Sequence, residues 1–190
     1  MSFLELSVES RTLSVRRVMV REAVCDLFRA DVWVRAGDAS IDLAQLVDRE
    51  ATLTVSDRDE SAGSIRKWEG IVRRAELHKG VPREGRREQQ TTQSPYFLEV
   101  VPKLWRATQK KNHRIFQRLS IPDIVEKVLE AWGVDDDWKD VDRAKYPKLE
   151  YKVQYGESDF AFLTRLLEEA GIAWLLSLIH IYGRRHDRQP

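Results

Sequence analysis

The stretch YPKLEYKVQYGESDFAFLTRLLEEAG, residues 146–171, decides the fold that we expect for the second half of the chain. Apolar and polar side chains alternate at its start, which predicts a strand with one apolar, half-buried face and one polar face. The apolar positions are Leu149, Tyr151, Val153 and Tyr155, and the polar ones are Glu150, Lys152 and Gln154.

A helix is predicted directly after this strand. Gly156 and Glu157 break the alternation, Ser158 can cap the following N–H groups, and Asp159 places a negative charge at the positive end of a helix. Apolar residues then recur at helical spacing as far as Gly171, where a left-handed C-terminal cap is typical. They are Phe160, Leu163, Leu166, Leu167 and Ala170.

A second helix is predicted between Ser120 and Gly133. Its apolar residues form one stripe, Ser120 can cap its start, and Pro122 fits the first turn, where its missing N–H costs nothing. The stripe comprises Ile121, Ile124, Val125, Val128, Leu129 and Trp132. Two helices flanking a strand indicate an α+β unit. The acidic linker at 135–147, DDDWKDVDRAKYP, is expected to be exposed, with Trp138 as its one anchor.

The first part of the chain has a pattern of mostly period two, which predicts a closed or sandwiched antiparallel sheet. The expected strands are 3–9, 14–22, 28–35, 51–57 and 68–77, with a helical turn at 42–47 and a further strand at 96–105. Trp33 lies opposite the face shared by Phe28, Ala30, Val32 and Val34. Its side of the sheet is therefore expected to be covered too, by another strand, another domain or a second subunit.

Three segments resemble the VgrG proteins, which are the valine-glycine repeat spike proteins of type VI secretion, and the related phage tail-hub proteins. They are FLEVVPKLW at 97–105, RIFQRLSIPDIVEKVLEAWG at 114–133 and KLEYKVQYGESDFAFLTRLLEEAGI at 148–172. The resemblance covers most of residues 1–174 and is strongest after Tyr96. It implies an α+β, mainly β fold: an antiparallel barrel-like domain at 1–95, followed by an α+β unit of the hub at 96–174.

The resemblance also implies a function. The chain is expected to be a structural, non-enzymatic component of a contractile injection machine, the N-terminal hub part of a type VI secretion spike. The intact protein is expected to be a homotrimer that meets secretion tube and baseplate proteins and is exported by type VI secretion. Residues 175–190 depart from the family because 175–182 lack the alternation of its next strand. We expect this tail to be truncated or frame-shifted, with the puncturing spike absent.

Composition excludes several other classes. The 32 basic and 31 acidic residues almost balance, which gives no global reason to expect nucleic acid or an anionic membrane as a partner. The N-terminus lacks a secretory signal, so synthesis in the cytoplasm is expected. The longest apolar run, 172–182, is well short of the roughly 20 residues that span a membrane. The single Cys25 is expected to be a buried small apolar residue.

One cationic segment, residues 103–118, supports an alternative function as a nucleic-acid-binding module. Its members are Lys103, Arg106, Lys110, Lys111, Arg114 and Arg118, with Trp105, His113 and Phe116 among them. We favour a solvated or subunit-facing surface for this segment. The polar stretch 79–94 is expected to be a solvated loop, although it contains Arg83, Arg86 and Arg87.

No residues are assigned to catalysis, to a cofactor, to a metal or to a small-molecule substrate. His78, His113, His180 and His186 follow no metal-ligand spacing. Ser158 is explained by capping. Glu168 and Glu169 are adjacent on a helix, so their side chains diverge by about 100° and cannot form an opposed carboxylate pair.

Overall fold

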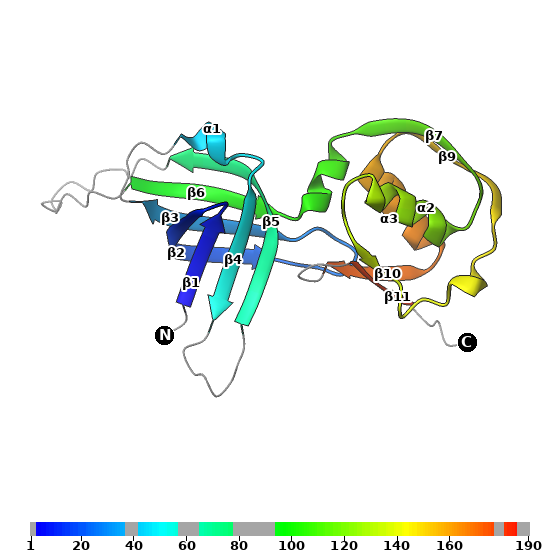
Figure 1. The fold of residues 1–190 in the computed structure, drawn as a ribbon, viewed down its shortest axis with the longest axis horizontal. Helices are drawn as coiled ribbons and strands as arrows, with labels where there is room; N and C mark the ends of the chain where they lie inside the picture. The colour runs from blue at the N-terminus through cyan, green and yellow to red at the C-terminus, as the bar shows by residue number, and fades with distance from the viewer. Residues whose placement is uncertain (1–2, 37–41, 57–64, 78–93, 177–180, 186–190) are drawn as a thin grey trace, which may run out of the picture. The chain divides into compact units, whose positions relative to one another are not determined.

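The computed structural model describes residues 3–36, 42–56, 65–77, 94–176 and 181–185. The chain forms two compact units (Figure 1). The first comprises Met1–Arg21 and Phe28–Pro102, and the second comprises Glu22–Leu27 and Lys103–Pro190.

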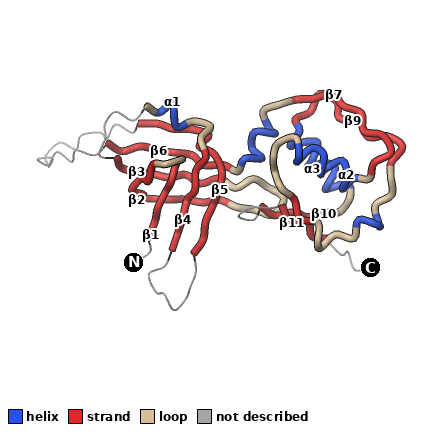
Figure 2. Tube along the Cα trace, viewed as in Figure 1, coloured by secondary structure: helices blue, strands red, loops and turns tan. Residues whose placement is uncertain are grey.

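The first unit is a closed antiparallel barrel with the strand order β1-β2-β3-β6-β5-β4 (Figure 2). Its elements are β1 (Phe3–Val8), β2 (Arg11–Arg21), β3 (Arg29–Ala36), α1 (Leu43–Leu46), β4 (Glu50–Ser56), β5 (Ile65–Leu77) and β6 (Ser94–Val101). Pairing of β1 with β4 closes the cylinder. Closure leaves no strand edge open within the barrel.

The barrel core confirms the predicted alternation in β3. Ala30, Val32 and Val34 are buried, and they pair in register with Val100, Leu98 and Tyr96 of β6, which are buried as well. On the opposite face of β3, the ring of Trp33 lies 5.3 Å from that of Phe97, and the Arg17 guanidinium lies 4.9 Å from the Trp33 ring centre. Strands of the same barrel thus supply side chains that cover Trp33.

Two acidic residues face each other across β3 and β6. Asp31 and Glu99 are cross-strand partners and both are buried, an arrangement that destabilises a sheet unless cations offset it. Arg29 Nε lies 2.8 Å from Asp31 Oδ1, and Arg73 Nη1 lies 2.9 Å from Glu99 Oε1. The positive charges of the two arginines offset the repulsion between the paired acids, so this strand register is stable.

The boundary between the units differs from the expected break after residue 95. The barrel extends to Pro102 because β6 pairs with both β3 and β5. The expected strand 96–105 is wrong in its last part, since β6 ends at Val101 and Lys103–Thr108 form a 3-10 helix, η1. Proline has no N–H to continue the ladder, which explains the end of the strand at Pro102.

The second unit combines two helices, a two-stranded ribbon and a small three-stranded sheet. Its elements after η1 are β7 (Lys111–Leu119), α2 (Ile121–Glu130), β8 (Asp136–Asp137), η2 (Arg143–Lys145), β9 (Leu149–Ser158), α3 (Asp159–Glu169), β10 (Ile172–Leu176) and β11 (Ile181–Arg185). Strands β7 and β9 form an antiparallel ribbon, which curves around α2 and α3 in Figure 1.

The helix signals in the sequence are confirmed. Ser120 and Asp123 form a reciprocal capping box on α2, and the Ala161 N–H donates to Ser158 Oγ at the start of α3. Gly133 and Gly171 follow the two helices at φ +61° and +67°, where glycine is the least strained residue. The helices pack through a shared apolar core: Leu104, Ala107, Ile124, Val125, Val128, Leu129, Val141, Phe162, Leu163, Leu166, Leu167, Ile172 and Trp174.

The linker 135–147 has more anchors than Trp138. Val141 is buried, and Arg143 binds Asp123 and Glu126 of α2 at 2.6 and 2.9 Å. The hydrogen bonds that Arg143 donates to Glu126 and Asp123 outweigh the effect of burial and hold the pKa of Arg143 above its ordinary value. The linker is therefore fastened to α2 by an ion-pair cluster.

The missing alternation expected at 175–182 is described only in part: residues 175–176 and 181–182 lie in strands, and 177–180 lie outside the described residues. β10 continues through Leu176, with Ile172 and Trp174 buried and Leu175 exposed, and it pairs with β11. β11 in turn runs parallel to β8. The expected loop 79–94 lies outside the described residues, apart from Ser94 at the start of β6. The origin of residues 175–190 stays a prediction.

Replacing Gly70 by alanine tests the packing of β5 against β6. A Cβ at this position would lie 2.0 Å from the backbone oxygen of Val101, which a side-chain rotation cannot relieve. We expect Gly70→Ala to destabilise the barrel by about 1–3 kcal/mol or more in urea unfolding. Lys67→Ala, at an exposed position of the same strand, is the control and is expected to change stability by less than about 0.5 kcal/mol. Equal effects of the two substitutions would contradict this packing.

Candidate functional site

The β7–β9 ribbon is oriented opposite to the sequence prediction. Its apolar face points to solvent: Tyr155 is 81% exposed, Ile115 66% and Tyr151 62%. Cross-strand pairing joins His113 to Tyr155, Ile115 to Val153 and Gln117 to Tyr151. We call these six residues the outer ribbon face. The expectation that the apolar side of this strand is the half-buried one is therefore wrong.

The inner face of the ribbon meets the helices and is mixed in polarity. Phe116 stacks on Phe162 of α3 with ring centres 5.6 Å apart. Polar side chains accompany it: Gln154 is fully buried, and Asn112 and Arg114 are directed to the same place as Gln154. The ribbon thus turns its polar side inward because a buried charge lies beneath it.

That charge is the carboxylate of Asp159, the first residue of α3. Asp159 Oδ1 accepts hydrogen bonds from Asn112 Nδ2 and Gln154 Nε2, each at 2.8 Å, and from Arg114 Nη2. Its Oδ2 accepts from Trp132 Nε1 at 2.9 Å. The backbone N–H of Asp159 also donates to the Lys110 carbonyl. One side chain therefore joins β7, β9, α3 and the end of α2.

The electrostatics of Asp159 follow from this enclosure. Burial raises the pKa of the carboxyl group, but hydrogen bonds from Asn112, Gln154, Trp132 and Arg114 outweigh it, so the pKa lies below its ordinary value. A charged carboxylate saturated with donors is a poor base or nucleophile, because donors already occupy its lone pairs. The arrangement fits a structural role, in which the Asp159 carboxylate holds the surrounding elements together by hydrogen bonds; we call this role the brace.

The spacing of residues in α3 carries a sequence signal for this role of Asp159. Asp159 occupies the first position of the buried stripe of α3, followed at i+3, i+4, i+7 and i+8 by Phe162, Leu163, Leu166 and Leu167. Phe160 was predicted in this stripe but is only half-buried. Assigning Asp159 to helix-dipole stabilisation alone was therefore incomplete.

A second ionic cluster covers the edge of β9 that does not pair with β7. Arg165 contacts Glu157 at 2.6 Å and Glu169 at 2.9 Å, and Lys152 pairs with Glu169. Arg165 Nη2 also donates to the Val153 carbonyl at 3.2 Å. Glu168 is exposed, so the two adjacent glutamates have separate surroundings.

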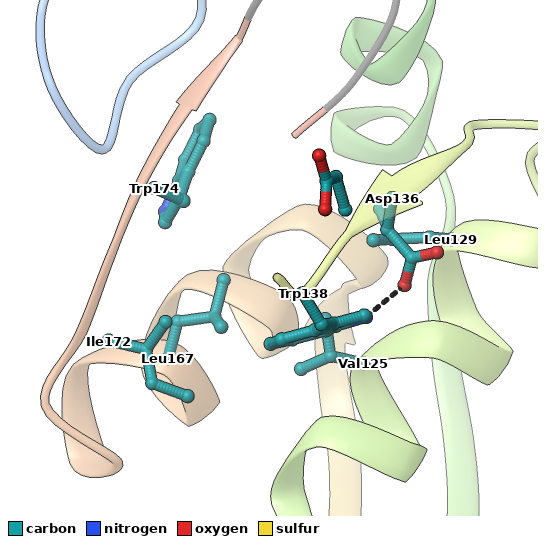
Figure 3. A pocket seen from close by; sticks show the side chains of 8 residues that line it. Val125, Leu129, Asp136, Trp138, Leu167, Ile172 and Trp174 are labelled. Carbon is teal, nitrogen blue, oxygen red and sulfur yellow. Dashed lines mark hydrogen bonds between the residues drawn. The ribbon is translucent and has the colours of Figure 1, made fainter. Parts of the chain in front are cut away.

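A small cavity of about 10 Å³, room for about one water molecule, lies between the helices and β10 (Figure 3). It is lined by Val125, Leu129, Asp136, Asp137, Trp138, Leu167, Ile172 and Trp174. Trp138 Nε1 donates to Asp136, as the dashed line in Figure 3 marks. With mostly apolar walls and few convergent polar groups, this space is a packing gap and not a typical substrate site.

The cationic segment 103–118 does not form one patch. It is divided between η1 and β7, and Arg114 is directed inward to Asp159. Lys103, Lys110, Lys111 and Arg118 are exposed, while Phe116 faces the core. Arg114 is engaged by Asp159 and half-buried Phe116 by Phe162, so neither projects freely for contact with nucleic acid. This arrangement favours the structural interpretation.

The other residues considered in the sequence have structural surroundings where they are described. His113 contacts Tyr155 on the outer ribbon face, with ring centres 5.0 Å apart. Half-buried Cys25 donates its N–H to the Trp174 carbonyl, and its Sγ accepts from the Trp174 N–H. His78, His180 and His186 lie outside the described residues, as do Arg83, Arg86 and Arg87.

Two kinds of feature are absent from the described part of the chain. No group of three or more His, Cys, Asp or Glu residues is placed to hold a metal ion there. No helix there is both long enough and apolar enough to cross a membrane.

Comparison with known families identifies the fold and extends the local resemblance. The model of the phage tail baseplate hub (GPD) family matches residues 21–177. The chain belongs to this family. It corresponds to the N-terminal region of VgrG spike proteins, as the sequence resemblance predicted.

Curated relatives are type VI secretion spike proteins. The chain is 32% identical over 165 residues to VgrG3 of Vibrio cholerae, covering 87% of this chain and 14% of that protein. It is 28% identical over 184 residues to VgrG1c of Pseudomonas aeruginosa, covering 92% and 24%. The chain thus spans about a quarter or less of the length of these relatives.

Solved structures show the same fold. A component of the Escherichia coli type VI secretion system, described as similar to the bacteriophage T4 tail proteins gp27 and gp5, superimposes with a TM-score of 0.69 at 21% identity, covering 93% of this chain and 48% of that one. A chain of a Francisella PdpA–VgrG complex gives a TM-score of 0.70 at 9% identity, covering 98% and 32%. The predicted mainly β, tail-hub-like fold is confirmed.

Removing the charge of Asp159 tests its role as a brace. Asp159→Asn keeps the size of the side chain but leaves Arg114 without its buried anion and turns an NH₂ group toward existing donors. We expect a loss of about 3 kcal/mol in urea unfolding followed by tryptophan fluorescence. Glu168→Gln, on the exposed side of α3, is the matched control. A loss no larger than that of the control would refute the brace.

The lowered pKa of Asp159 predicts a dependence on pH. Because the folded-state pKa lies below the unfolded one, the stabilisation is complete above the unfolded value of about 4 and is lost as pH falls through the folded value. The difference in unfolding free energy between wild type and Asp159→Asn should be constant near neutral pH and shrink below about pH 4. A difference that grew on acidification would have the wrong sign.

Proposed function

We propose that this chain is a structural part of a contractile injection machine, the hub portion of a type VI secretion spike. The single observation that carries the proposal is the family match over residues 21–177. The closed barrel followed by an α+β unit supports it.

We propose further that the intact protein is a homotrimer that contacts secretion tube and baseplate proteins and leaves the cell through the type VI machinery. The outer ribbon face supports this proposal, because exposed aromatic and aliphatic side chains that adjoin on one sheet mark contact surfaces. Among structural neighbours, VgrG occurs in a complex with PdpA.

We propose a non-enzymatic role for this part of the protein. One relative is the actin cross-linking toxin VgrG1 of Vibrio cholerae, which is 29% identical over 186 residues, yet this chain covers only 16% of it. Such partial coverage leaves room for toxic activity elsewhere in that protein. In this chain, the most enclosed carboxylate among the described residues of the α+β unit, that of Asp159, already accepts hydrogen bonds from four donors.

A domain exchange tests the proposed hub role. Residues 3–176 of this chain would replace the matching segment of Vibrio cholerae VgrG3. Light scattering of the purified chimera is expected to give three times the mass of one chain, and cells producing it are expected to release the spike through type VI secretion. The same chimera carrying Asp159→Asn serves as a folding control. A folded chimera that stays monomeric would refute the proposal.

A further inference from the structure

One edge of β7 has no partner strand in the described part of the second unit. Among the described strands, β7 pairs only with β9. The far edge of β9 is covered by α3, through Arg165 and the pair formed by Lys152 and Glu169. The ribbon therefore has one covered edge and one edge at which further pairing is open.

The contact between Arg165 and Val153 indicates which backbone groups face the open edge. The Val153 carbonyl turns toward Arg165 of α3, which places it away from β7. Val153 and Ile115 then form a non-hydrogen-bonded pair, so the N–H and C=O of Ile115 point outward as well. By the period of two along a strand, His113 and Gln117 present their backbone groups in the same direction.

The same three residues also carry outward side chains. His113, Ile115 and Gln117 lie on the outer ribbon face beside Tyr155, Val153 and Tyr151. The irregularity in register lies between Asn112 and His113, before this run begins. A strand added to β7 would thus find regular hydrogen-bonding groups and a continuous, mainly apolar sheet face.

The charges of β7 define what kind of strand fits. Its sequence, KNHRIFQRL, contains no acidic residue. Lys110 and Lys111 are exposed at one end and Arg118 at the other, whereas Arg114 points inward. Cations at both ends favour a partner that is apolar in its centre and acidic at its flanks, and they disfavour a cationic one.

We propose that the open edge of β7, from His113 to Gln117, binds an extended segment of a partner protein by strand addition, and that this segment is apolar in its centre and acidic at both flanks. Main-chain hydrogen bonds would supply affinity, while Lys111 and Arg118 would select the flanks. The proposal rests on the geometry and charge of β7 and does not depend on the hub role.

Three blocked, fluorescein-labelled peptides test this proposal in anisotropy titrations with the 190-residue chain. One has alternating valine and threonine flanked by two aspartates at each end. The second has lysines in place of the aspartates. The third repeats the first with N-methyl groups on alternate residues, which block one edge of the peptide without changing its charge.

We expect saturable binding of the aspartate peptide and binding of the lysine and N-methyl peptides that is weaker by about tenfold or more. The double variant Lys111→Glu, Arg118→Glu should reverse the preference between aspartate and lysine flanks. Its circular dichroism spectrum should match that of the wild type, because both positions are exposed.

Three results would overturn the proposal. The first is the absence of aspartate-peptide binding by the wild-type chain. The second is equal binding of the N-methyl peptide, which would indicate charge attraction without strand pairing. The third is self-association of the chain in sedimentation that the double variant abolishes, since a second copy would then occupy the edge.

Discussion

The second unit depends on one buried ion, the carboxylate of Asp159. A charge in an apolar core is tolerated only when donors surround it, and here the donors come from β7, β9 and the end of α2. This demand explains why the ribbon turns Gln154 and Arg114 toward the helices. Because successive residues of a strand point to opposite faces, the same choice sends Ile115, Tyr151 and Tyr155 outward.

The barrel also contains buried acidic side chains, and arginines of its own strands balance their charge. Its strands close on themselves, so the main-chain groups pair internally, and Asp31 and Glu99 tolerate each other through Arg29 and Arg73. The two units thus differ in whether their described strands have edges without a partner strand. Among the described strands, those of the barrel all have partners on both sides, whereas β7 of the ribbon has a partner on one side only, and the ribbon also has an apolar outer face. Contacts in a larger assembly that rely on exposed apolar surface would therefore draw on the ribbon.

Much of the fold could be predicted because local signals were strong. Alternation in β3, the caps at Ser120 and Ser158, and the glycines at 133 and 171 all rest on physical chemistry within a few residues. β7 was missed because its apolar residues are few and cations interrupt them. The orientation of the β9 ribbon could not be predicted, since hydrophobicity alone favoured burial of Tyr151 and Tyr155. The ribbon has the opposite orientation because the buried Asp159 carboxylate needs hydrogen-bond donors, and these come from residues of β7 and β9.

The orientation of the ribbon is the central claim of this account, and cysteine labelling tests it directly. In a Cys25→Ser background, Ile115→Cys and Phe116→Cys place single thiols on adjacent residues that point to opposite faces of β7. We predict that a thiol-specific reagent modifies the cysteine at position 115 rapidly in the folded chain and the one at position 116 much more slowly. Rapid modification at position 116 together with protection at position 115 would contradict the account.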